Sequence, residues 1–219
     1  MPRASGGIKK ATKEAKTQGL YDRIADVHNL AMKVNGYKQS VAKYFKSLNL
    51  ELDENSVVLD AGSGTGMITL GFHDAGIRVK KIVDLDLSRR SLGVAREEII
   101  KKKRCARRTD FVQADVLKMP FADETFDLVI TCGVLEYTPL DEGLREAARV
   151  LKSGASLVFL PVKPSVVGSV LELLYNFKTH SLASMRTAAQ QYFRIVGNHE
   201  FPITDPISWS KTIFLLEKI

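Results

Sequence analysis

The stretch VVLDAGSGTGM, residues 57–67, decides the fold of this chain. An apolar, strand-like run leads into Gly62, Gly64 and Gly66, and an apolar helical pattern follows them. Glycine permits positive φ and lets a ligand approach the backbone closely, which a Cβ would hinder. A strand, a glycine-rich turn and a helix in this order are typical of nucleotide-binding α/β folds, so the sequence predicts a ligand at this turn.

The residues around the glycines exclude two kinds of ligand. A dinucleotide fingerprint needs Gly or Ala at the sixth position, where this chain has Met67 counted from Gly62 and Thr69 counted from Gly64. A triphosphate loop needs Gly-Lys-Ser/Thr, but Gly66 is followed by Met-Ile. What remains is a nucleoside that carries its own positive charge beside the acidic Asp60, with a tight turn that binds nothing as the alternative.

Carboxylates stand at the ends of the next strands. Asp84 and Asp86 end the second strand, where nucleotide-binding folds place the acid that accepts the ribose hydroxyls, and Asp115 follows the third strand. Each acid alone is also explained as a surface or capping residue. Asp60, Asp86 and Asp115 at three successive strand ends instead predict a nucleoside site above the sheet, because charge-assisted hydrogen bonds anchor such ligands.

Strand and helix patterns alternate along the chain. Strands are predicted at 56–61, 79–86, 109–115, 126–133 and 156–162, and helices at 67–74, 88–103 and 141–151, with Ser88 as an N-cap. This alternation predicts right-handed crossovers and a parallel sheet. Two helical stretches, 165–177 and 181–191, precede a closing strand pair formed by FRIVG (193–197) and WSKTIFLLEKI (209–219).

Composition indicates one globular domain with a basic N-terminal extension. The chain has 219 residues, 45% of them hydrophobic, and no apolar run of the length that spans a membrane, so we expect a cytoplasmic protein with reduced thiols at Cys105 and Cys132. Residues 1–50 contain ten Lys or Arg and three acids, and thus carry the whole net charge of +7. We expect a disordered basic leader at 1–19, an N-terminal helical lid at 20–50 and the main domain at 51–219. Such a leader is either simply solvated or attracts an anionic membrane, RNA or substrate.

These segments together resemble the S-adenosylmethionine-dependent methyltransferases of the Rossmann-like class. The resemblance is carried by an ordered series: VVLDAGSGTG (57–66), VDLDLS (83–88), QADVLKMPFADETFDLVI (113–130) and LREAARVLKSGASLVF (144–159). Within the class, the chain is most similar to the group that contains the ubiquinone and menaquinone biosynthesis methyltransferases, through MPFADETFD (119–127) and YDRIA (21–25). It departs from that group at His28, where a second aromatic residue is usual, and at KSGAS (152–156), which replaces Lys-Pro-Gly-Gly.

The resemblance implies a doubly wound α/β fold with a seven-stranded, mostly parallel sheet, an antiparallel last strand and an N-terminal helical lid. It implies S-adenosylmethionine as cofactor and S-adenosylhomocysteine as product. It assigns the following residues to the cofactor: Tyr21, Asp60, Ala61, Gly62, Ser63, Gly64, Gly66, Asp86, Leu87, Asp115, Val116, Cys132 and Gly133. In this assignment Asp60 and the glycines surround the methionine part, and Asp86 binds the ribose. Leu87 and Val116 enclose the adenine, Asp115 binds its amino group, and Cys132 and Gly133 lie beneath the sulfonium.

Methyl transfer from a sulfonium is an in-line displacement that needs positioning more than acid-base chemistry, and it requires no metal. A base helps only when the acceptor must lose a proton. Glu136 and Tyr137, which follow the fourth strand, are the first candidates. His28 is a further candidate, with a purely structural position on the outside of a helix as its alternative.

The acceptor is predicted to lie against the lid and against a helical insertion at 161–192. VVGSVLELLYNF (166–177) is either part of the core or part of the pocket wall, and a pocket wall of this kind favours a small apolar acceptor such as a quinone precursor or a lipid. The basic leader and KKKRCARR (101–108) favour an RNA methyltransferase as the second hypothesis, although the second run also suits a helix end. The third is a non-catalytic S-adenosylmethionine-binding module.

Overall fold

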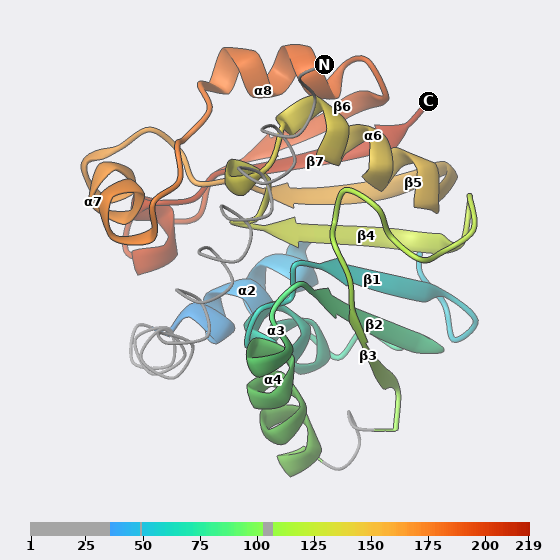
Figure 1. Ribbon diagram of the computed structural model, residues 1–219. Coiled ribbons are helices and arrows are strands. Elements are labelled where there is room, and N and C mark those ends of the chain that lie inside the picture. Colours follow the sequence, from blue (N-terminus) through green and yellow to red (C-terminus); the bar gives the residue numbers. More distant parts are fainter. Residues whose placement is uncertain (1–35, 49, 103–106) are drawn as a thin grey trace, which may run out of the picture.

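A computed structural model describes residues 36–48, 50–102 and 107–219 of the protein (Figure 1). A seven-stranded sheet with the order β3-β2-β1-β4-β5-β7-β6 forms its centre, and helices lie on both faces of the sheet. The strand order reverses direction between β1 and β4, which is the arrangement of doubly wound α/β folds. This confirms the predicted fold class. The leader at 1–19, residues 20–35 of the predicted lid and residues 103–106 of the second basic run lie outside the described residues.

The first half of the sheet is parallel. It consists of β1 (Val57–Ala61), α3 (Met67–Asp74), β2 (Lys81–Asp86), α4 (Arg89–Lys101) and β3 (Thr109–Gln113). Val58 and Leu59 point to opposite faces of β1 and are both fully buried, as expected for a strand covered by helices on both sides. The predicted N-cap is confirmed, because the Ser88 hydroxyl accepts a hydrogen bond from the Ser91 amide.

The second half of the sheet ends in an antiparallel pair. Its elements are β4 (Phe126–Cys132), the 3₁₀ turn η1 (Leu135–Tyr137), α6 (Leu140–Val150), β5 (Leu151–Leu160), α7 (Val166–Tyr175), α8 (Leu182–Ala189), β6 (Phe193–His199), the 3₁₀ turn η2 (Pro206–Trp209) and β7 (Ile213–Lys218). β4 pairs with β1 and β5 in parallel, whereas β7 is antiparallel to both β5 and β6. The closing strand pair and the antiparallel last strand are therefore confirmed.

Strand β5 begins at Leu151 rather than at Ser156, where the sequence pattern predicts it. Leu151 is fully buried and pairs with Phe126 across a register shift in β4. The exposed residues from Lys152 to Gly154 conceal this early start in the sequence, because they interrupt the apolar pattern.

Helix α2 (Tyr37–Ser47) belongs to the core on one face of the sheet. It packs against α3, where the Phe45 and Phe72 rings meet edge to face with centroids 5.1 Å apart and both are almost fully buried. Val41 approaches Gly71 so closely that a Cβ on Gly71 would lie 3.0 Å from the Val41 Cβ. This part of the predicted lid segment therefore contributes to stability, while a lid function for residues 20–50 stays a prediction.

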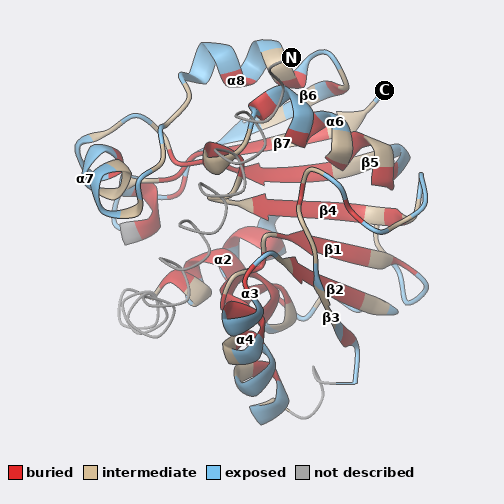
Figure 2. Ribbon diagram, in the orientation of Figure 1, coloured by how far each residue is buried: buried red, intermediate tan, exposed pale blue. Residues whose placement is uncertain are grey.

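Helix α7 does not belong to the core. Val166 and Leu173 are each 85% exposed, and Gly168 is the only buried residue of the helix. Figure 2 shows α7 as a largely exposed helix at the margin of the sheet, whose strands are buried. The interpretation of the apolar stretch 166–177 as core is wrong, because the loops around α7 carry it away from the sheet. Among the described residues, no helix is long and apolar enough to cross a membrane.

Candidate active site

The glycine turn connects β1 to α3 in the conformation that the sequence predicts. Gly62, Gly64 and Gly66 all have positive φ, at 81°, 54° and 77°. A Cβ on Gly62 would overlap the Val134 side chain, which follows β4, so the turn is pressed against the neighbouring segment. At Gly64 nothing lies within 4 Å of the Cβ position, so this residue presents backbone to open space.

Asp86 fixes the turn to the end of β2. One carboxylate oxygen accepts a hydrogen bond from the Gly64 amide at 2.8 Å, and the other accepts from the Ser88 amide at 2.8 Å. The amides of Gly62 and Ser63 both donate to the Leu85 carbonyl, at 2.7 and 2.9 Å. Asp86 is therefore brought to the turn as predicted, and it also shapes the turn.

Asp60 and Asp84 lie beneath the turn, fully buried, and share the hydroxyl of Thr69. The Thr69 Oγ1 lies 2.8 Å from Asp60 Oδ2 and 2.6 Å from Asp84 Oδ1. One hydroxyl hydrogen cannot serve two carboxylates, so at least one of the acids holds a proton for both contacts to be hydrogen bonds. Burial raises the pKa of Asp60 to about 7, and burial together with the charge of Asp60 raises the pKa of Asp84 well above its ordinary value.

The third predicted acid lies beside the second. The Ala114 amide donates to the Asp86 carbonyl, which holds the chain after β3 against the end of β2. Asp115 follows directly, and its side chain accepts from the Leu117 amide at 2.8 Å. Leu87 is 38% exposed and Val116 is buried. The predicted nucleoside-binding acids therefore gather at the carboxyl edge of the sheet, the edge where the parallel strands end.

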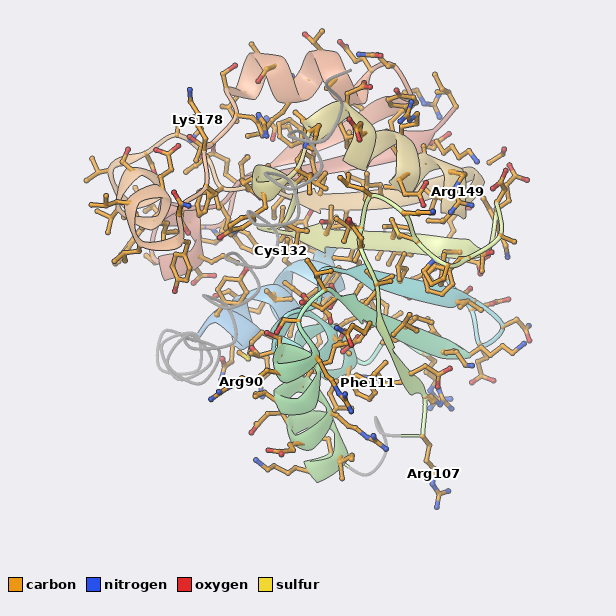
Figure 3. The ribbon with its side chains drawn as sticks, viewed as in Figure 1. Arg90, Arg107, Phe111, Cys132, Arg149 and Lys178 are labelled. Carbon is orange, nitrogen blue, oxygen red and sulfur yellow. The ribbon has the colours of Figure 1, made fainter. Side chains whose placement is uncertain are left out.

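A second polar group forms where β4 ends, near the centre of the molecule (Figure 3). The Tyr37 hydroxyl lies 2.9 Å from the Cys132 Sγ, and burial raises the pKa of both groups. Glu136 is buried in η1, where one oxygen accepts from the Val162 amide. Its other oxygen, Oε2, is buried without a hydrogen-bond partner among the described residues.

The remaining predicted residues differ in position. The Tyr137 ring packs edge to face on Phe177, with centroids 5.2 Å apart. Tyr21 and His28 lie outside the described residues. Between 36 and 219, apart from 49 and 103–106, no cluster of three or more His, Cys, Asp or Glu side chains is arranged to hold a metal ion.

Sequence reasoning missed three residues of the site. Tyr37 and Thr69 were predicted only as helix positions, and Lys211 only as part of a closing strand. Lys211 is buried, and its Nζ would lie 2.5 Å from a Cβ placed on Gly133. The sequence shows Lys211 directly before an apolar strand. That position indicates a site residue only once β7 is known to run antiparallel and to begin at the carboxyl edge of the sheet.

Comparison with known proteins agrees with this geometry. A family model described as "Methyltransferase domain" matches residues 59–159. The chain is 32% identical over 186 residues to the ubiquinone/menaquinone biosynthesis C-methyltransferase UbiE of Brucella anthropi, covering 79% of this chain and 70% of that protein. The chain therefore belongs to the S-adenosylmethionine-dependent methyltransferase family of the Rossmann-like class.

More specific likenesses follow from the same comparisons. The chain is 30% identical over 170 residues to the UbiE protein of Rhizobium rhizogenes, covering 72% of this chain and 66% of that protein. It thus spans about two thirds of the length of the curated relatives it matches. Among solved structures, geranyl diphosphate C-methyltransferase from Streptomyces coelicolor superposes with a TM-score of 0.68 at 14% identity, covering 81% of this chain and 78% of that one. This last likeness concerns the fold.

Proposed function

We propose that the protein transfers a methyl group from S-adenosylmethionine to a small apolar acceptor of the quinone or lipid kind. The observation that carries the proposal is a pair of buried polar atoms at the glycine turn. Asp60 Oδ1 and Ser63 Oγ have no hydrogen-bond partner among the described residues. Buried polar atoms without partners are costly, so the turn fits a ligand with polar groups of its own.

The groups at the carboxyl edge match the parts of this cofactor. Asp60 suits the ammonium of the methionine part, and Asp86 suits the ribose hydroxyls, because it is a carboxylate at the end of β2 that is held beside the glycine turn. Asp115 suits the adenine amino group, with Leu87 and Val116 on either side of the ring. When bound, the cofactor supplies a methyl group on a positively charged sulfur.

Glu136 is the best placed base. Its free oxygen lies in a buried setting after β4, next to Cys132 and Gly133, where the methyl group is expected. Glu136 Oε2 is the oxygen that could take the proton an acceptor hydroxyl loses, whereas the Tyr137 ring packs on Phe177. For His28 and Tyr21 the assigned roles stay predictions.

Two observations favour a small apolar acceptor. The curated relatives at about 30% identity are named quinone C-methyltransferases, and a structural neighbour is named as acting on geranyl diphosphate, which has a hydrocarbon chain. Helix α7, which ends two residues before Phe177, exposes Val170, Leu173 and Leu174. An apolar wall of this kind suits a hydrocarbon acceptor better than a nucleic acid.

Calorimetric titration with S-adenosylhomocysteine tests the cofactor site. We expect the Asp86→Ala variant to bind S-adenosylhomocysteine at least about tenfold more weakly, because the hydrogen bonds expected between the two ribose hydroxyls and the carboxylate are lost. Asp86→Asn keeps an acceptor for the Gly64 amide and separates loss of binding from loss of the turn. Asp110→Ala, at an exposed acid of β3, is the matched control. Equal affinity in the wild type and Asp86→Ala, or no binding by the folded wild type, would contradict the proposal.

A further inference from the structure

Lys211 is a largely buried lysine that lies just before β7. Its side chain is 7% exposed, and no carboxylate of the described residues forms an ion pair with it. Lys218, by comparison, reaches both Glu124 and the Leu151 carbonyl. The stem of Lys211 is buried, whereas its ammonium keeps contact with solvent and has no carboxylate partner among the described residues, so the cation is available to an anion that enters the site.

The direction of β7 explains why Lys211 lies at the site. Parallel strands end at the carboxyl edge of the sheet, but β7 runs the other way and begins there. Lys211 forms a β-bridge with Val162, just after β5, and its neighbour Ser210 accepts from the Lys163 amide. The lysine is thereby held at the same edge as the ends of β1 and β4.

The surroundings of the ammonium are those of the site already described. Gly133, with φ of 67°, leaves room for the lysine, since a Cβ there would lie 2.5 Å from Nζ. The charge of Lys211 partly offsets the effect of burial on the pKa of the Cys132 thiol, so the two groups are close. Val162, the bridge partner of Lys211, donates its amide to Glu136. Glu136 therefore contacts the residue that pairs with Lys211. Its other oxygen is buried without a hydrogen-bond partner among the described residues.

We propose that Lys211 binds an anionic oxygen of the methyl acceptor, a phenolate or enolate oxygen next to the carbon that receives the methyl group. The inference rests on the proposed function and names the acceptor class for the same site. The proton of the acceptor hydroxyl passes to Glu136 Oε2, and the oxyanion that remains faces the Lys211 ammonium. The electron pair that stays on the oxygen is conjugated to the adjacent carbon and makes that carbon nucleophilic.

A phenol or enol fits Lys211 and Glu136 better than a carboxylic acid. An acceptor hydroxyl gives its proton to Glu136 Oε2, which has no hydrogen-bond partner among the described residues, and the oxygen that remains faces Lys211. An acceptor that arrives as a carboxylate has no proton to give, so the buried Glu136 oxygen would stay without a hydrogen bond. The combination of Lys211 with an unpartnered Glu136 therefore selects an ionisable hydroxyl.

The test uses 4-nitrophenol as a probe, because its phenolate absorbs visible light and its neutral form does not. The probe is titrated into the full-length protein with S-adenosylhomocysteine present and absent, and the absorbance gives the apparent pKa of the bound phenol. We expect the wild type to lower that pKa by stabilising the phenolate. We expect Lys211→Met to bind the phenolate about 10- to 100-fold more weakly, and Lys211→Arg to retain most of the binding.

Lys178→Met is the matched control, because Lys178 is exposed in the connection between α7 and α8 and points outward (Figure 3). Methionine nearly matches the length of the lysine stem, so Lys211→Met is expected to stay folded, which circular dichroism checks. Equal phenolate binding by the wild type and Lys211→Met would overturn the proposal, and so would stronger binding of benzoate than of nitrophenolate. Calorimetry with S-adenosylhomocysteine on the same samples separates this outcome from failure of the cofactor site.

Discussion

Replacing Asp60 with Asn is expected to stabilise the protein at neutral pH, although Asp60 lies in the candidate site. Burial raises the pKa of Asp60 from 3.8 to about 7, so the folded protein holds a proton that the unfolded chain releases. The stability that this proton contributes is complete below pH 3.8 and is lost as the pH rises to about 7. From these two pKa values the loss amounts to about 4 kcal/mol.

Asparagine has the same shape and carries no charge, so it avoids this loss. Its amide oxygen accepts from Thr69 as the carboxylate does, or its amide nitrogen donates to Thr69 while the hydroxyl turns to Asp84. We therefore expect Asp60→Asn to match the wild type near pH 4 and to exceed its free energy of unfolding by up to about 4 kcal/mol at pH 8.

Urea unfolding at pH 4 to 8, followed by circular dichroism without ligand, measures this difference. Asp110→Asn, at an exposed carboxylate of β3, is the control, because it removes an acid far from the Thr69 contacts. A constant difference between Asp60→Asn and the wild type across this range would refute the reasoning, since it would mean that Asp60 is ionised throughout.

Three further substitutions test other parts of the fold. Gly62→Ala places a methyl group against Val134 at a residue with φ of 81°. We expect it to lower the free energy of unfolding in urea by about 1 to 3 kcal/mol and to weaken S-adenosylhomocysteine binding in calorimetry. Wild-type stability and affinity would be inconsistent with the close approach of Gly62 to Val134. Arg149→Met removes a side chain that donates to two carboxylates and two backbone carbonyls, and should cost about 2 kcal/mol in the same unfolding assay, whereas Arg149→Lys should recover only part of this. Phe45→Ala removes the ring that packs between α2 and α3, and should lower the free energy of unfolding by about 3 to 5 kcal/mol. A loss below about 1 kcal/mol would mean that α2 detaches readily from the core.

The sequence predicts the parallel half of this protein almost completely. Helix α3 was predicted with its observed bounds, and the positive φ of Gly62, Gly64 and Gly66 follows from the turn that the strand and helix patterns require. These features depend on neighbouring residues in the chain, so a local pattern is sufficient to find them.

The missed features depend on residues that are distant in the chain. In the sequence, Thr69 looks like any other helix residue. Its role depends on the sheet register, which places Asp60 beside Asp84 so that both carboxyl groups contact the Thr69 hydroxyl. Tyr37 meets Cys132 from 95 positions away. The exposure of α7 was also unpredictable, because its apolar sequence alone does not tell whether the loops carry it toward the sheet or away from it.

The reversed direction of β7 has a consequence for how the family diversifies. Apart from Tyr21, the groups assigned to the cofactor lie at the ends of the parallel strands, between residues 60 and 133, whereas the cation assigned to the acceptor enters from the antiparallel hairpin of β6 and β7. The hairpin is the outer part of the sheet and leaves the glycine turn untouched. A new acceptor preference is therefore accessible by exchange of one peripheral hairpin, while the machinery that holds the methyl donor is inherited unchanged.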